Sequence, residues 1–210
     1  MKSKTLREDA MEIKRFIGGI LEANGYVLSD PQTSTCWIVD PGYKPKVFIQ
    51  YVKQQELQPL GILLTHHHSD HTGAADQVRR ALDCPVYIHK ADADRYGEWV
   101  DVLLEGGEGL TLGDERFSVQ HTPGHTKGSV CFLFRKSRAC FTGDTVFNVD
   151  LGRTDLEDGS FEEMCESILQ VADHWAGDIT IYPGHGDSCT MKTVRRINQE
   201  FIDIVAKAGR

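Results

Sequence analysis

Short apolar or alternating runs occupy the first third of the chain. Runs with the period-two pattern of strands lie at residues 12–20, 26–29 and 36–39. We expect Gly and Asn-Gly turns to join them, as at Asn24-Gly25, where a positive φ costs little. The run 46–54 is compatible with a helix or an edge strand, and the fully apolar run 60–64 predicts a buried strand that ends at Thr65-His66.

Helical and strand patterns alternate through the rest of the chain. Helical spacing predicts helices at residues 73–82, about 160–175 and 193–208, the second opened by a capping box from Ser160 to Glu163. Strands are expected at residues 86–88, 109–120, 129–134, 139–142 and 179–182. The pattern predicts a mixed α/β chain that forms a single domain over residues 1–210, with no repeat or linker.

Composition and charge exclude several function classes. The formal net charge is −8 and no Lys/Arg-rich run occurs, which argues against nucleic acid as a partner. No stretch approaches the ~20 apolar residues of a membrane span, and the charged N-terminus does not resemble a signal peptide, so we expect a cytoplasmic protein without a membrane partner. The six cysteines lack a CxxC pair, which indicates small buried side chains rather than a disulfide framework.

The densest chemical signal is the segment Thr65-His66-His67-His68-Ser69-Asp70-His71. Imidazole and carboxylate are the usual ligands of zinc-like ions. In extended backbone, residues two apart point the same way, so His66 and His68 can bind one ion while His67 faces elsewhere. A turn after His68 would let Asp70 and His71 reach a second ion.

Three further candidates stand in glycine-flanked loops after predicted strands: His125, Asp144 and His185. Seven candidate ligands result. Dividing them assigns His66, His68 and His125 to one metal and Asp70, His71 and His185 to another, with Asp144 as the bridge. We expect two divalent ions, with zinc as the first choice and iron or manganese as alternatives.

The order and spacing of these seven residues resemble the signature of the metallo-β-lactamase superfamily, over about residues 36–185. The resemblance implies a four-layer αββα sandwich with two metals in a cleft at one edge of the paired sheets. Residues 143–147, 152–156 and 158–160 are similar to the glyoxalase II-like branch, which implies hydrolysis of a thioester such as a hydroxyacylglutathione. Zinc β-lactamases usually carry a cysteine where Asp144 stands, which argues against antibiotic degradation.

Two departures from glyoxalase II concern glutathione. Only about 25 residues follow His185, whereas full-length glyoxalase II adds a helical C-terminal region that helps to hold glutathione. Thr154 and Asp155 stand where that branch usually has aromatic residues. The resemblance therefore implies metal-dependent hydrolysis more firmly than it implies a glutathione carrier.

The expected chemistry assigns roles to the remaining residues. A hydroxide that bridges two ions is nucleophilic near neutral pH, and we expect Asp70 to orient it as the catalytic residue. Asp40 is a candidate partner for the outer nitrogen of a ligand histidine, or else a simple turn residue. Candidate substrate contacts are Arg153, Lys127 and Lys192, although Arg153 is more readily explained as an anchor of its own loop through Asp155.

Other functions stay open at this point. A persulfide dioxygenase would hold one Fe(II) with His66, His125 and Asp144 and leave open positions for oxygen. A lactone or ester hydrolase would keep both metals and change the pocket. A metal-binding protein without turnover would need an occluded site, and nothing in the sequence suggests one. The partner in the first three cases is a small molecule, and the oligomeric state is not indicated.

Overall fold

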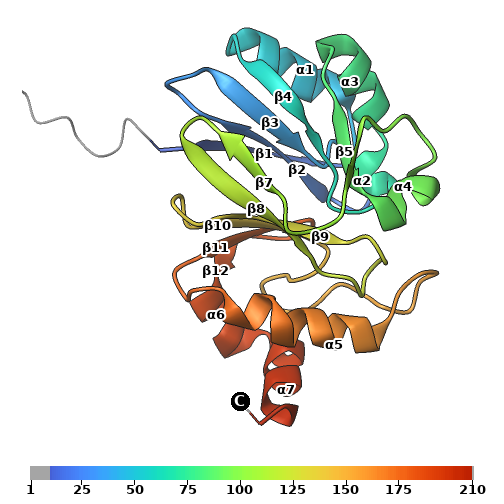
Figure 1. The fold of residues 1–210 in the computed structure, drawn as a ribbon, viewed down its shortest axis with the longest axis vertical. Coiled ribbons are helices and arrows are strands. Elements are labelled where there is room, and N and C mark those ends of the chain that lie inside the picture. Colours follow the sequence, from blue (N-terminus) through green and yellow to red (C-terminus); the bar gives the residue numbers. More distant parts are fainter. Residues whose placement is uncertain (1–9, 210) are drawn as a thin grey trace, which may run out of the picture.

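Two six-stranded sheets form the centre of the molecule. The computed structural model describes residues 10–209, so the charged N-terminal segment 1–9 lies outside the described residues (Figure 1). The first sheet runs in the order β1 (Glu12–Gly18), β2 (Ala23–Ser29), β3 (Thr35–Val39), β4 (Gln58–Leu63), β5 (Val86–His89) and β6 (Val102–Leu104). Its first two pairings are antiparallel and the next three are parallel.

The second sheet runs in the reverse order of the sequence. Its strands are β12 (Cys189–Thr190), β11 (Thr180–Pro183), β10 (Ala139–Gly143), β9 (Val130–Phe134), β8 (Glu115–His121) and β7 (Gly109–Leu112). Only β10 and β11 pair in parallel. Because β8 and β10 are each antiparallel to β9, the strands β8, β10 and β11 run in the same direction.

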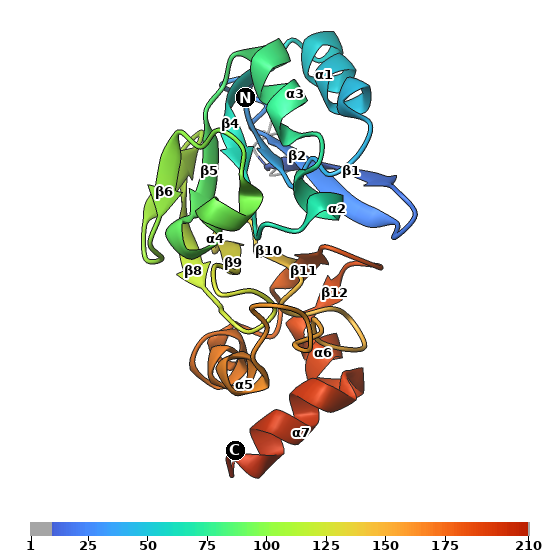
Figure 2. The same ribbon diagram turned by 90° about the vertical axis from the view of Figure 1, so that its right-hand side faces the viewer.

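Helices cover the outer faces of both sheets. The helices are α1 (Pro45–Gln54), α2 (Ser69–Thr72), α3 (Ala75–Leu82), α4 (Lys90–Tyr96), α5 (Phe161–Gln170), α6 (Met191–Ile197) and α7 (Gln199–Lys207), with a 3₁₀ turn at Ala172–His174. Figure 2 shows α1 and α3 on one side of the paired sheets and α5, α6 and α7 on the other. Within the described residues, no helix is long and apolar enough to cross a membrane.

Alternation along each central strand divides the core into layers. In β3, Ile38 packs under α1 and α3, whereas Trp37 and Val39 face the second sheet. In β9, Phe132 faces the first sheet, whereas Leu133 packs beneath the C-terminal helices. A strand buried on both faces explains why these runs are almost continuously apolar. The fold is the expected αββα sandwich.

Several expected elements differ from the observed ones. Asn24 and Gly25 lie inside β2, and the preceding turn is closed by the Glu22 N–H donating to the Gly19 carbonyl. Buried Asn24 donates instead to the Pro183 carbonyl, a long-range contact that local turn statistics do not contain. The run 46–54 is a helix, begun by Pro45 in its first turn.

Chain breaks account for the other differences. The expected strand 109–120 is a hairpin, because Gly113 adopts φ +57 and turns the chain between β7 and β8. The last helix is interrupted at Asn198, whose side chain accepts a hydrogen bond from Phe201 N and begins α7. Ser160 caps α5 as predicted, accepting from Glu163 N. Helices α2 and α4 and strands β6 and β12 were not anticipated from the sequence.

Candidate metal centre

The candidate ligands come from loops that follow the carboxyl ends of strands in both sheets. The segment that contains His66 and His68 follows β4, and Asp40 follows β3. From the second sheet, His125 follows β8, Asp144 follows β10 and His185 follows β11. The structure therefore brings together residues that are up to 119 positions apart, from His66 to His185, at one edge of the sandwich.

Three imidazoles form the first set of candidate ligands, His66, His68 and His125, and their nitrogens lie within 4.8 Å of one another. His68 Nδ1 lies 2.9 Å from His125 Nε2. His66 has no exposed surface, and the ring of His68 meets it edge to face at a centroid distance of 4.8 Å. His67 points away toward Asp92, as the period of two predicts.

Imidazoles and a carboxylate form the second set, Asp70, His71 and His185. His71 Nε2 lies 3.2 Å from His185 Nε2 and 3.3 Å from Asp70 Oδ2. His185 Nε2 lies 3.2 Å from the same Asp70 oxygen. Helix α2 begins directly after His68, so its first turn carries Asp70 and His71 into the second set.

Asp144 lies between the two sets. Its Oδ1 is 3.4 Å from His71 Nε2, and its Oδ2 is 3.4 Å from His125 Nε2. The chain passes very close behind this carboxylate: a Cβ at Gly184 would lie 2.1 Å from Asp144 Oδ1, so only glycine fits there. The geometry permits Asp144 to serve both sets, as expected for a bridge.

The outer nitrogens of four histidines face protein oxygen atoms, three of them within hydrogen-bond distance. His125 Nδ1 lies 2.7 Å from the Arg153 carbonyl oxygen and His185 Nδ1 lies 2.9 Å from that of Leu21. His66 Nδ1 lies 3.0 Å from Thr65 Oγ1. His71 Nδ1 lies 3.4 Å from Asp40 Oδ2, the position expected of Asp40. Carbonyl and carboxylate partners hold the proton on Nδ1 and leave the Nε2 lone pair directed inward.

Asp40 also supports the backbone of the histidine segment. Its two carboxylate oxygens accept from the Thr65 N–H at 2.8 Å and from the Thr65 hydroxyl at 2.6 Å. Asp40 itself is buried and adopts φ 47, a conformation that aspartate tolerates better than most residues. One carboxylate therefore anchors the start of the ligand segment and faces His71.

Electrostatics distinguish the two sets. Burial, reinforced by the neighbouring imidazoles of His71 and His125, lowers the pKa of His66 well below its usual value. Burial and the His125 ring lower the pKa of His68 to about 4. These rings are neutral at pH 7, which is the form that binds metal.

In the second set, neighbouring carboxylates shift the histidine pKa in the opposite direction. Burial alone would lower the pKa of His71, but the charges of Asp144 and Asp40 and a hydrogen bond with Asp40 raise it well above its usual value. Burial alone would raise the pKa of Asp70, but hydrogen bonds from His185 and His71 hold it well below its usual range. The Asp70 carboxylate is therefore ionised.

The donor set fits divalent ions. His66 Nε2 and Asp144 Oδ1 are buried and lack a hydrogen-bond partner among residues 10–209, although unpaired buried polar atoms are costly. Nitrogens that share a tetrahedral ion at ordinary Zn–N distances lie roughly 3.3 Å apart. The observed 2.9 and 3.2 Å separations between facing ring nitrogens are close to that value. Both sets can therefore hold an ion such as zinc, iron or manganese.

A buried carboxylate that sequence reasoning missed ties the two loops of the first set together. Asp92, on α4, is 1% exposed. It accepts from His67 N at 2.9 Å, from Thr126 Oγ1 at 2.8 Å and from Gly128 N at 2.6 Å. Hydrogen bonds from His67 and Thr126 lower the pKa of Asp92 against the opposing effect of burial. No local pattern marks Asp92, because its partners lie 25 to 36 positions away.

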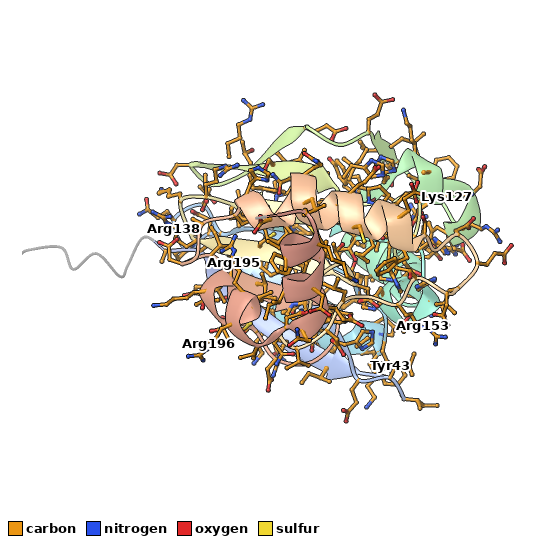
Figure 3. All side chains as sticks on the ribbon, turned by 90° about the horizontal axis from the view of Figure 1, so that it is seen from below. Tyr43, Lys127, Arg138, Arg153, Arg195 and Arg196 are labelled. Carbon is orange, nitrogen blue, oxygen red and sulfur yellow. The ribbon has the colours of Figure 1, made fainter. Side chains whose placement is uncertain are left out.

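The candidate substrate contacts are dispersed. Arg153 lines the cleft beside His125, with its guanidinium bound to Asp155 through Nε at 2.8 Å and Nη2 at 3.0 Å. Lys127 binds Asp158 at 3.1 Å and borders a separate hollow. Lys192 is exposed at the start of α6 and is not among the described residues that line the cleft. In Figure 3, Lys127 and Arg153 lie on one side of the molecule, opposite Arg138 and Arg195.

Comparison with known protein families gives a match over the same region. The model of the family described as the metallo-beta-lactamase superfamily matches residues 18–188, which include all seven candidate ligands. A Bacillus subtilis protein named Probable metallo-hydrolase YqgX is 36% identical over 201 residues, covering 87% of this chain and 94% of its own. A hydroxyacylglutathione hydrolase of Bdellovibrio bacteriovorus is 36% identical over 146 residues, covering 70% of this chain and 57% of that protein.

Solved structures give the same result for the fold. The BLEG-1 B3 metallo-beta-lactamase superposes with a TM-score of 0.82 at 33% identity, covering 90% of this chain and 99% of that one. TTHA1623, solved in a di-iron-bound form, has a TM-score of 0.77 at 30% identity, covering 88% of this chain and 98% of that one. One similar protein thus bears a β-lactamase name, so the argument against antibiotic degradation from Asp144 stays a prediction.

Proposed function

The chain belongs to the metallo-beta-lactamase superfamily, and from that premise we propose that it is a dinuclear metal-dependent hydrolase that cleaves a small-molecule thioester. One observation carries the two-ion part of the proposal. The two candidate sets are each complete in three residues, and Asp144 lies within 3.4 Å of a nitrogen from each. A site for one ion alone would not explain why the ligand atoms of Asp70, His71 and His185 converge.

The thioester part of the proposal depends on similarity. The residues around Asp144 and Arg153 are similar to the glyoxalase II-like branch, and one relative that is 36% identical is named a hydroxyacylglutathione hydrolase. This chain spans only 57% of that relative's length. A thiol is also a good leaving group, because its ordinary pKa of ~8.5 lets it depart as thiolate without a strong proton donor.

The chain's residues have distinct tasks in this proposal. His66, His68 and His125 would hold one ion, Asp70, His71 and His185 the other, with Asp144 shared. Bound there, divalent ions supply a water of lowered pKa and polarise a carbonyl oxygen. The ionised Asp70 carboxylate lines the cleft with 23% of its side chain exposed, so it can accept a hydrogen bond from the attacking water and orient it.

The identity of the ions is a separate part of the proposal. Zinc suits a site of imidazole and carboxylate ligands, and iron and manganese accept the same donors. The similar protein TTHA1623 was solved with two irons. Metal analysis therefore precedes any activity assay.

The test combines metal counting with four activity assays on one preparation. The protein is purified without added metal, and Zn, Fe and Mn are quantified per chain. Hydrolysis of S-D-lactoylglutathione and of S-acetyl-N-acetylcysteamine is then measured, together with oxygen uptake on glutathione persulfide and hydrolysis of a chromogenic cephalosporin. We expect about two ions per chain and thioester hydrolysis that Asp70→Asn lowers by roughly a hundredfold, the size of effect that follows loss of a positioned acceptor.

Each alternative has its own outcome. One iron per chain with oxygen uptake and no thioester hydrolysis would establish the persulfide dioxygenase instead. Turnover of the cephalosporin with both thioesters inert would support the metal centre and reject thioesters as the substrate class. Asp158→Asn is the control variant, because Asp158 pairs with Lys127 and Arg95 outside the residues that line the cleft.

A further inference from the structure

The cleft above the candidate metal centre has a volume of about 730 Å³, large enough for a substantial organic substrate. Its floor consists of His68, Asp70, His125, Asp144 and His185. Most of the remaining lining comes from two places: the β1–β2 turn supplies Leu21, and the segment that follows Asp144 supplies residues between 147 and 156. Ser69 and Gly186 also line the cleft. The floor determines the chemistry, so the walls must determine which molecule is bound.

Apolar side chains form most of the wall surface: Leu21, Phe147, Val149, Leu151 and Leu156. Three of them are strongly exposed, Leu21 at 65%, Val149 at 53% and Leu156 at 37%. Single exposed apolar residues are ordinary on a protein surface, but several that converge on one concavity mark a binding surface. The Phe147 ring also meets that of His185 at a centroid distance of 6.0 Å, so the apolar wall reaches the floor of the cleft.

Charged groups on the wall do not favour a polyanionic ligand. Arg153 is the one cationic wall residue among the described residues that line the cleft, and the Nε and Nη2 edge of its guanidinium is bound to Asp155. Asp150 adds a negative charge to the same wall. Arginine ordinarily recognises a carboxylate through a bidentate pair of N–H groups, and here Asp155 occupies one such pair and offsets the positive charge.

The lysines nearest in sequence to the cleft loops do not supply further positive charge to the cleft wall. Lys127 is held by Asp158 and borders a hollow that also contains Glu162, Glu163 and Glu166. Lys192 does not line the cleft. A glutathione carrier bears two carboxylates several bonds away from its sulfur. Beyond the candidate ligands, the lining of the cleft consists largely of apolar side chains, with Asp150 and an arginine already paired to Asp155.

We propose that the substrate of this cleft is a thioester with an apolar acyl group on a thiol carrier that lacks carboxylates near the sulfur, bound against Leu21, Val149 and Leu156. This inference rests on the proposed thioester hydrolysis. It names the substrate class of the same site.

The test compares matched thioesters on the metal-loaded enzyme. Acetyl, butanoyl and hexanoyl groups are each joined to N-acetylcysteamine and to glutathione, and kcat/KM is measured for all six. We expect kcat/KM to rise about threefold per methylene, as expected for burial of a CH₂ group in a partly open site. At equal acyl length, the N-acetylcysteamine ester should exceed the glutathione ester by at least about tenfold.

Variants separate the wall from general effects. Val149→Asn should lower kcat/KM for the hexanoyl ester by about tenfold while changing the acetyl ester less than about twofold. The matched control is Leu103→Asn, because Leu103 is 57% exposed on β6 and does not line the cleft. Asp155→Asn releases the Arg153 fork and should raise kcat/KM for glutathione esters at least about threefold.

Binding of inert analogues distinguishes the two levels of the proposal. S-hexyl-N-acetylcysteamine and S-hexylglutathione are thioethers that the enzyme cannot hydrolyse, and calorimetry measures their Kd. Tighter binding of the first, together with thioester turnover, supports the inference. Tighter binding of the first without thioester turnover overturns the proposed function and leaves only the preference of the cleft wall for an apolar ligand without carboxylates. Thioester turnover with a preference for glutathione esters, or without dependence on acyl length, overturns the inference and leaves the proposed function standing.

Discussion

The two halves of the metal centre are built differently. The first set consists of three imidazoles, supported by the Arg153 carbonyl behind His125, by Thr65 beside His66 and by the Asp92 network that binds the backbone of His67. The second set combines two imidazoles with one carboxylate, and Asp70 Oδ2 lies within 3.3 Å of the Nε2 atoms of both His71 and His185. Hydrogen bonds from His185 and His71 hold the pKa of Asp70 low in the second set, whereas burial and neighbouring rings lower the pKa values of His66 and His68 in the first.

This difference indicates which half depends more on its ion. Neutral imidazoles that converge without a carboxylate of their own gain most when a cation is placed among them, because His66 Nε2 is buried with no hydrogen-bond partner among the described residues. The second set already satisfies several of its polar atoms through internal hydrogen bonds. The loss of metal and of activity should therefore be largest for changes that act on both halves, smaller for changes in one half, and smallest for changes in the residues that support one half.

Removal of all metal should have the largest effect. Dialysis against a chelator should reduce hydrolysis to background, and added zinc should restore it, because the attacking water then loses its activation. Ions present at about a hundred times their Kd stabilise the fold by about 2.7 kcal/mol, so the Tm should fall by roughly 5–10 °C. Calorimetry with and without chelator measures the shift, and an unchanged Tm would show that the ions do not bind the folded chain as described.

Asp144→Ala should have the next largest effect, because Asp144 contacts imidazoles of both sets. We expect both ions to be lost or weakened and kcat/KM to fall by about 10⁴. Metal content per chain measured by mass spectrometry checks the first part. Retention of two tightly bound ions by the variant would contradict the bridging role.

Substitution of one histidine from each set sharpens the comparison. His66→Ala should remove the ion of the first set and lower kcat/KM by about a thousandfold, and His185→Ala should remove the ion of the second and cost about a hundredfold. His66 is fully buried, whereas 27% of the His185 side chain is exposed, so water can replace His185 more easily. His174→Ala, at an exposed position, is the control. Equal losses from both variants would remove the distinction between the halves.

Asp92→Asn should have the smallest effect and should act on the first set alone. The amide brings N–H groups against donors from His67, Thr126 and Gly128, which should lower metal affinity at the first set by about 10- to 100-fold and stability by roughly 1–3 kcal/mol. Competition with a chromogenic chelator measures each affinity. Asp94→Asn, an exposed carboxylate on the same helix, should change neither quantity. An equal loss at both sets would indicate general loosening of the fold.

The sequence by itself determined much of the candidate centre. The ligand segment 66–71 is a local feature, because the period of two in extended backbone and the turn that follows assign its side chains to two directions. Glycine-flanked loops after apolar runs likewise pointed to His125, Asp144 and His185. The pattern of apolar runs predicted a mixed α/β chain, and the family resemblance implied the αββα layers. The ligand segment and each glycine-flanked loop can be recognised from a few neighbouring residues.

Only the tertiary structure decided what surrounds that centre. Asp92 carries no local mark, since its partners come from two other loops. The Asn24-Gly25 pair has the sequence of a turn, yet both residues lie inside β2. There the Asn24 side chain donates a hydrogen bond to the Pro183 carbonyl, 159 positions away. The apolar wall joins Leu21 to residues that follow Asp144. Side chains that meet only after both sheets pack leave no periodic trace in either segment, because short-range patterns record which face is buried and not which distant residue covers it.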